Sequence, residues 1–113
     1  MKDGAYILAY DVGTTAVKTC LYHIDSEIEL IASAGESYPL NVLSNGGAEQ
    51  NPEDWWSAIC LTTKQVIAKS GFPSEAVSGI SFCTQMQGLI LVDKNGKPVR
   101  PAMNYMDQRA SKE

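Results

Sequence analysis

The chain is poor in the residues that build cross-linked or metal-stabilised domains. Its 113 residues include only three cysteines and one histidine, and Cys20, Cys60 and Cys83 lie far apart with no C-x-x-C pair. An odd number of widely spaced cysteines argues against a disulfide framework and against a structural zinc site. Each cysteine lies in an apolar stretch, where a free thiol packs as a small hydrophobic group. This usage is typical of a reducing compartment, and we expect a cytoplasmic protein.

Long apolar runs and basic clusters are also missing. The N-terminal apolar run covers only residues 5–10, which is too short for a signal peptide or a bilayer-spanning helix. Nine Lys and Arg against thirteen Asp and Glu give a formal net charge of -4. The composition therefore disfavours membrane insertion and nucleic-acid binding. A mildly acidic surface still permits phosphate binding, because backbone N–H groups can hold an anion.

Neither of the common nucleotide-binding loops is present, since the sequence contains no G-x-x-x-x-G-K-[ST] and no G-x-G-x-x-G. The candidate in their place is Asp11-Val12-Gly13-Thr14-Thr15, directly after the apolar run. Gly13 permits backbone angles that other residues avoid, and the two threonines offer hydroxyl and N–H groups to a phosphate. Asp11, at the carboxyl end of a buried strand, can hold a hydrated magnesium ion. Taken alone, the segment fits an ordinary hairpin turn equally well.

The first third of the chain reads as three strands joined by short turns. Residues 5–10 form a continuous apolar run, which predicts a strand buried on both faces. Residues 17–22 and 28–34 alternate with period two, as strands with one wetter face do. Short connections between such strands predict an antiparallel meander. Residues 38–50 follow without any period and are expected to be loop.

One strong helix signal follows, and it makes the chain an α/β domain of 113 residues. Asn51 suits the N-cap, Pro52 suits the first turn, and Gly71 suits the C-terminal cap. The stripe expected to face the core consists of Trp56, Ile59, Cys60, Thr63, Val66 and Ile67. Residues 77–83 then form a strand that the helix returns parallel to an earlier one. A polar loop at residues 84–88 and a hairpin of two further strands complete the pattern.

Four stretches, in order along the chain, resemble the FGGY family of carbohydrate kinases. Residues 10–18 are similar to the phosphate-binding hairpin of the actin, chaperone and sugar-kinase superfamily. Residues 50–56, Gln-Asn-Pro-Glu-Asp-Trp-Trp, resemble the helix entry E-Q-x-P-x-x-W-W of the FGGY kinases. Residues 81–89 and 100–109 resemble two further signatures of that family, most similar to its xylulokinase branch. The first stretch alone indicates only the superfamily, whereas the four together indicate the family.

The resemblance implies a ribonuclease-H-like mixed sheet of the actin-like ATPase type, with residues 1–113 as the N-terminal part of the first of two lobes. The second lobe is then absent from this chain. ATP and Mg²⁺ are the implied cofactors. By resemblance, Asp11 takes part in catalysis and binds the metal, while Gly13, Thr14 and Thr15 face the ATP phosphates.

The same resemblance implies a sugar site at Gln85, Met86 and Gln87, with Tyr105 as an aromatic wall beside it. The general base of the family is an aspartate far downstream, and the adenosine pocket is downstream as well. These residues alone are therefore expected to be inactive as a kinase.

Two departures from the xylulokinase pattern concern this sugar site. Gln87 stands where those kinases typically have histidine, and Tyr105-Met106 stands in place of Trp-Asn. A glutamine donates and accepts hydrogen bonds but does not titrate. The resemblance implies a ketopentose such as xylulose as substrate, and the two departures leave another polyol or a sugar acid open.

Interpretations that place the protein in another functional class also remain open. The Asp-x-Gly-Thr-Thr turn occurs equally in an actin- or chaperone-like ATPase module that binds a partner protein. An interaction module without chemistry is a third reading, with exposed apolar surfaces open to a homodimer. Of the other residues singled out, Trp55 and Trp56 are expected to be structural, and Asp107 and Arg109 to form a local ion pair or to orient the sugar loop.

Overall fold

Three antiparallel strands at the N-terminal end form the frame of the molecule. The computed structural model describes residues 4–111, so both ends of the predicted domain, residues 1–3 and 112–113, lie outside the described residues. Strands β1 (Ala5–Val12), β2 (Ala16–Ile24) and β3 (Ile28–Ser37) follow one another as a meander. β1 pairs antiparallel with β2, and β2 pairs antiparallel with β3. The predicted meander is confirmed, with each strand longer than its sequence pattern indicated.

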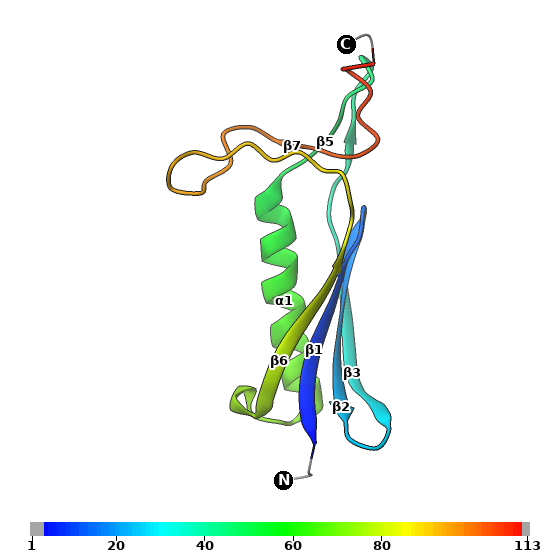
Figure 1. Cartoon of the computed structure of the whole chain (residues 1–113), viewed down its shortest axis with the longest axis vertical. Helices are drawn as coiled ribbons and strands as arrows, with labels where there is room; N and C mark the ends of the chain where they lie inside the picture. Colours follow the sequence, from blue (N-terminus) through cyan, green and yellow to red (C-terminus); the bar gives the residue numbers. More distant parts are fainter. Residues whose placement is uncertain (1–3, 112–113) are drawn as a thin grey trace.

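A crossover helix adds a fourth strand on the other side of β1. Helix α1 (Pro52–Ser70) leads through the 3₁₀ turn η1 (Ser74–Ala76) into β6 (Val77–Thr84). β6 lies parallel to β1, so the sheet has the mixed order β3-β2-β1-β6 with α1 along one face (Figure 1). Because β1 and β6 are parallel neighbours, their carboxyl ends meet at one edge of the sheet. Ligands of open α/β sheets bind at edges of this kind.

The helix begins and ends at the predicted residues. The Asn51 side chain accepts a hydrogen bond from the N–H of Glu53 at 3.1 Å, and Pro52 occupies the first turn. Gly71 closes the helix with φ of 73°, a left-handed conformation that other residues adopt at a cost. Within residues 4–111, no helix is long and apolar enough to cross a bilayer.

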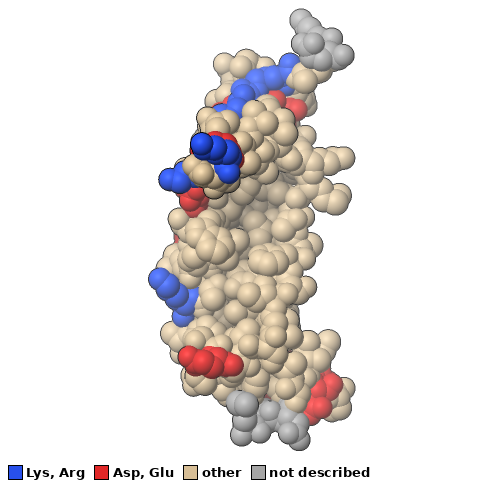
Figure 2. Space-filling model, turned by 60° about the vertical axis from the view of Figure 1, so that its left-hand side comes forward, with Lys and Arg blue, Asp and Glu red and all other residues tan. Residues whose placement is uncertain are grey.

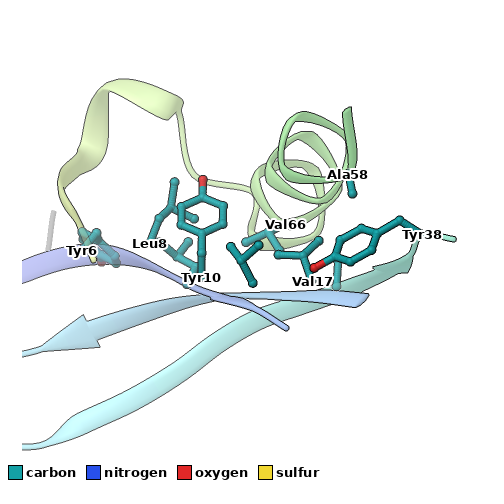
Figure 3. Packing of buried hydrophobic residues seen from close by; sticks show 10 residues of the cluster. Tyr6, Leu8, Tyr10, Val17, Tyr38, Ala58 and Val66 are labelled. Carbon is teal, nitrogen blue, oxygen red and sulfur yellow. The ribbon is translucent and has the colours of Figure 1, made fainter. Parts of the chain in front are cut away.

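The core lies between α1 and one face of the sheet. Val17 and Leu21 of β2 and Val66 of α1 are at most 1% exposed, and Figure 3 shows Val17 and Val66 side by side beneath the helix. In β1 burial alternates, so that Tyr10 is buried while Asp11 is exposed. The prediction that β1 is buried on both faces is wrong, because α1 covers only one face of the sheet.

The face of α1 that meets the sheet also differs from the predicted stripe. Its fully buried residues are Ala58, Thr62 and Val66, of which only Val66 was expected, and Trp56 is 62% exposed. The small side chains of Ala58 and Thr62 let the helix approach the strands closely, which turns bulkier residues away from the centre of the contact. Several of these line a mostly apolar groove of about 400 Å³ beside β6, where Trp56 lies near Phe82.

A second, smaller sheet lies beyond the carboxyl ends of β1 and β6 (Figure 1). It consists of β4 (Asn41–Val42), β5 (Ala48–Gln50) and β7 (Ala102–Met103), in the order β4-β5-β7. Two of these strands lie in residues 38–50, so the prediction of loop there is wrong. The expected hairpin after residue 88 is reduced to isolated bridges at Leu89↔Met103 and Val92↔Pro98. Prolines lack the N–H that a continuous ladder needs, and β7 pairs with β5 instead.

Candidate functional site

The turn between β1 and β2 is closed by a hydrogen bond from the N–H of Gly13 to the carbonyl of Ala16, at 2.9 Å. Gly13 does not adopt a positive φ, so the sequence-based reason for a glycine there is wrong. The structural reason is a close approach. A Cβ at position 13 would lie 3.2 Å from the carbonyl oxygen of Ala16, tighter than ordinary contact. Glycine therefore permits the tight closure of the turn rather than an unusual dihedral angle.

All three carbonyls of residues 13–15 point into the protein and accept hydrogen bonds. The hydroxyl of Tyr38 donates to the carbonyl of Gly13 at 2.5 Å, and its N–H donates to the carbonyl of Thr15 at 2.9 Å. The side chain of Gln50 donates to the carbonyl of Thr14 at 2.6 Å. The pKa of the Tyr38 phenol is raised, mainly by burial and to a smaller extent by the negative charge of Asp11. The hydroxyl therefore stays protonated and keeps donating.

The N–H and hydroxyl groups of Thr14 and Thr15 have no partner among the hydrogen bonds of residues 4–111. Thr15 is exposed and Thr14 is partly so. Each N–H lies opposite the preceding carbonyl across a planar peptide bond, so carbonyls that are held inside leave these two N–H groups free to donate to an anion. The turn is therefore chemically suited to a phosphate.

Asp11 lies at the carboxyl end of β1, on the sheet face that α1 does not cover. Lys18 of β2 and Cys83 of β6 are its neighbours across the strands, and the three line an open depression of about 330 Å³. In the described part of the chain, no group of three or more His, Cys, Asp or Glu could hold a metal ion. Mg²⁺ in phosphate sites needs only one or two carboxylates, with water and phosphate oxygens as the other ligands. Asp11 fits that donor set.

The predicted sugar loop begins beside the turn. The N–H of Gln85 donates to the carbonyl of Val12 at 2.9 Å, which continues the parallel pairing of β1 and β6 past the strand end. Met86 is 74% exposed, and Gln87 is exposed with φ of 61°. Gln87 is the one non-glycine residue with a positive φ in the described range 4–111. A glutamine costs about 1–2 kcal/mol in that conformation, and strain of this kind clusters at ligand sites.

This strain can be measured separately from the side chain. We expect Gln87→Gly to be more stable than Gln87→Ala by about 1 kcal/mol, because only glycine adopts the positive φ without a Cβ penalty. Both variants lose the same amide, so any change in sugar affinity should be equal in the two. Urea unfolding of both proteins measures the difference, and equal midpoints would show that the backbone here is unstrained.

The segment that carries Tyr105 is bonded to the sugar loop near Gln85 through a short bridge between Leu89 and Met103. The N–H of Leu89 donates to the carbonyl of Met103, and the reverse bond also forms, each at 2.9 Å. Asn104, 6% exposed, donates from its side chain to Gln85 at 2.7 Å. Tyr105 itself is 51% exposed. The aromatic side chain is thus half exposed, and in sequence it directly follows the residue that is bonded to Gln85.

Two buried amides of the site, Gln50 and Asn104, were not among the predicted site residues. Gln50 is 1% exposed and connects the turn to Gln85. Gln50 lies in a segment predicted to be loop, and Asn104 lies in the predicted returning strand of the late hairpin. In neither place does the hydrophobic pattern indicate a buried amide. For Gln50, the position directly before the helix N-cap, in a stretch with a family signature, was the only hint.

A cluster of charges fixes the last segment to the second sheet. Arg109 pairs with Asp107 at 2.5 Å and with Glu49 at 2.7 Å, and Glu49 also pairs with Arg100. The predicted ion pair of Asp107 and Arg109 is therefore confirmed. Figure 2 shows charges of both signs close together at this end of the molecule, above a largely uncharged middle. The pKa of Asp107 lies well below its usual range. The main cause is the hydrogen bonds from the Arg109 side chain, and the second is the bond from the N–H of Ala48.

This lowered pKa predicts how stability depends on pH. A carboxyl group whose pKa is depressed by folding contributes stability above its unfolded pKa, about 3.9, and loses that contribution as the pH falls further. We expect Asp107→Asn to be less stable than the wild type at pH 7, with the difference narrowing below about pH 4. Thermal unfolding between pH 7 and pH 3 tests this, and a difference independent of pH would contradict it.

The sequence and the fold of the chain match those of a known family. The model of the FGGY family of carbohydrate kinases, N-terminal domain, matches residues 6–113. The chain belongs to the FGGY family of carbohydrate kinases. It is 33% identical to a xylulose kinase of Staphylococcus xylosus over 109 residues, which cover 96% of this chain and 22% of that protein. It is 34% identical to a gluconokinase of Bacillus subtilis over 106 residues, or 94% and 20% of the two chains.

A solved FGGY structure has the same fold. The ligand-bound xylulose kinase of Lactobacillus acidophilus superposes with a TM-score of 0.83 and 29% identity, over 96% of this chain and 21% of that one. The expected actin-like ATPase fold is therefore confirmed for the part described. The chain spans about a fifth of the length of the curated relatives that it matches. The turn at residues 13–15 and the loop that begins at Gln85 lie side by side at one edge of the sheet, while the individual roles of the site residues stay predictions.

Proposed function

We propose that the kinase containing this chain transfers a phosphoryl group from ATP to a sugar hydroxyl, and that residues 13–15 bind the ATP phosphates. One observation carries the proposal. The carbonyls of the turn are held inside, and the N–H groups of Thr14 and Thr15 face outward at the carboxyl end of β1. Phosphoryl transfer depends mostly on positioning and on charge neutralisation, which such a rigid donor surface provides.

The remaining residues of the site take roles on either side of the turn. Asp11 holds a hydrated Mg²⁺, which when bound neutralises phosphate charge. Gln85 and Gln87 bind sugar hydroxyls through their amides, Met86 packs against the sugar, and Tyr105 stacks on it. Amide and aromatic groups suit a neutral, hydroxyl-rich substrate because they combine hydrogen bonds with an apolar surface.

The substrate we propose is a ketopentose such as xylulose. Support comes from the named relatives and from the sequence signatures around residues 81–89 and 100–109. A sugar acid is the second candidate, because the gluconokinase of Bacillus subtilis is as similar in sequence as the xylulose kinases are.

The rest of the active site is proposed to come from outside these 113 residues. The relatives are about five times as long as the segment they share with this chain. A second lobe there supplies the general base and the adenosine pocket, and lobe closure excludes water. We therefore expect no turnover from residues 1–113 alone. A cytoplasmic location, where ATP is supplied, and a homodimer are further proposals that rest on the sequence.

A coupled ADP-release assay on the complete kinase tests the proposal. The panel consists of xylulose, gluconate and glycerol, with a reaction lacking any sugar as control. We expect kcat/KM to be highest for xylulose. A maximum for gluconate keeps the kinase class and changes the substrate, whereas ADP release that no sugar stimulates removes the proposed function.

A further inference from the structure

Three side-chain amides form a continuous hydrogen-bonded chain across the candidate site. The side-chain nitrogen of Asn104 donates to Gln85 Oε1 at 2.7 Å. The nitrogen of Gln85 donates to Gln50 Oε1 at 3.0 Å. The nitrogen of Gln50 then donates to the carbonyl of Thr14 at 2.6 Å. At the other end, Asn104 Oδ1 accepts from the N–H of Met106 at 2.8 Å. We call Gln50, Gln85 and Asn104 the amide chain.

Backbone groups fix the direction of the amide chain at both ends. The carbonyl of Thr14 can only accept, so it must face the NH₂ group of Gln50. The N–H of Met106 can only donate, so it must face the oxygen of Asn104. Turning over a single amide places two oxygens or two NH₂ groups against each other. The three side chains therefore orient together.

Burial makes this arrangement costly to break. Gln50 is 1% exposed and Asn104 is 6% exposed, so water does not readily replace a lost partner. A buried polar group without a partner is strongly disfavoured. Gln50 also donates more weakly to the carbonyl of Pro39, at 3.4 Å. A displacement of the turn at Thr14 must consequently move the amide chain or break it.

We propose that Gln50 is a positioning residue that couples the phosphate turn to the sugar loop. The inference rests on the proposed function of the turn. A phosphate on the N–H groups of residues 14 and 15 fixes the peptide planes of the turn, and thereby the Thr14 carbonyl that holds Gln50. Gln50 holds Gln85, and Gln85 holds Asn104 beside Tyr105. Nucleotide binding thus orders residues 103–109 and raises the affinity for the sugar.

Hydrogen–deuterium exchange on the complete kinase tests the coupling without catalysis. Adding Mg·ADP should slow exchange in residues 13–15 and also in residues 103–109 of the wild type. In Gln50→Met, which has nearly the same volume but no amide, residues 13–15 should keep their protection, and the protection of residues 103–109 should be clearly weaker than in the wild type. If Mg·ADP protects the turn of the wild type but not residues 103–109, the inference is wrong and the proposed function stays in place. No protection of the turn removes the proposed function and this inference with it.

Binding measurements give a second readout, with the best substrate among xylulose, gluconate and glycerol as the sugar. Mg·ADP should tighten sugar binding at least about fivefold in the wild type. Gln50→Met should at least halve this ratio, while the bonds of Gln85 to the carbonyls of Val12 and Gly13 preserve the rest of the coupling. Gln50→Glu should do the same, because a carboxylate accepts from Gln85 but cannot donate to Thr14.

A matched control is available on the exposed face of α1. Gln65 is exposed, and Gln65→Met makes the same chemical change outside the amide chain. This variant should keep the wild-type ratio. If Gln50→Met weakens both ligands but keeps the ratio, Gln50 is merely structural and the proposal is wrong.

Discussion

In the complete kinase, Asp11→Asn is expected to lower kcat by about 10²–10³-fold, with a much smaller change in the KM for the sugar. The substitution keeps the size of the side chain and its place at the end of β1, and removes only the charge. If Asp11 holds Mg²⁺ as proposed, the neutral amide is a poorer ligand, and the charge on the transferring phosphoryl group is then less well neutralised. Steady-state kinetics at saturating sugar, over a range of Mg²⁺ concentrations, measure the loss.

Asp25 provides the matched control for this experiment. It is an exposed aspartate in the turn between β2 and β3, at the opposite end of the sheet from Asp11. Asp25→Asn makes the same change in charge and should leave kcat within about twofold of the wild type. An Asp11→Asn enzyme with wild-type kcat would show that the carboxylate takes no part in the reaction.

Leu21→Ala is expected to destabilise the protein by about 2–5 kcal/mol. Leu21 is the largest fully buried side chain, 1% exposed, and lies in the core between α1 and the sheet. Truncation leaves a cavity that the neighbouring side chains fill only in part, and the dense core loses dispersion contacts. Chemical denaturation of the purified protein measures the free energy of unfolding.

The neighbouring strand supplies the control for this core substitution. Leu30 of β3 is 54% exposed, so Leu30→Ala should change the free energy of unfolding by less than about 0.5 kcal/mol. A comparable loss in both variants would mean that the core is not centred between α1 and β2. The phosphate turn connects β1 and β2, so loss of this core should also loosen the turn.

Local signals were enough to predict the frame of the fold. The apolar run, the alternation, the N-cap at Asn51 and the glycine at position 71 act within a few residues, and they placed α1 and the strands of the four-stranded sheet correctly, but not the strands of the second sheet. The buried face of α1 could not be read in this way. A prediction from the hydrophobic stripe assigns large side chains such as Trp56 to the buried face, whereas close contact with a sheet favours small ones such as Ala58. Which face is buried depends on a partner that lies elsewhere in the sequence.

In the candidate site too, contacts that are local in sequence could be predicted and long-range contacts could not. The turn at residues 11–15 could be predicted because acid, glycine and hydroxyl groups lie together in sequence. The role of Gln50 could not be predicted from the sequence. Its partners Thr14 and Gln85 lie 36 and 35 residues away, and only the fold brings them together. The reason for Gly13 was also wrong, because a close backbone contact leaves no trace in composition. Long-range polar contacts are thus the part of the site that needed the structure.

The most direct test follows the amide resonances of Thr14 and Thr15 by NMR while Mg·ADP is added to the complete kinase, labelled at threonine. If residues 13–15 bind the nucleotide phosphates, both N–H resonances shift and saturate together at the concentration that half-saturates the enzyme. Threonines of the helix, Thr62 and Thr63, serve as internal controls and should move little. Unchanged Thr14 and Thr15 resonances at saturating Mg·ADP would contradict a phosphate site at this turn.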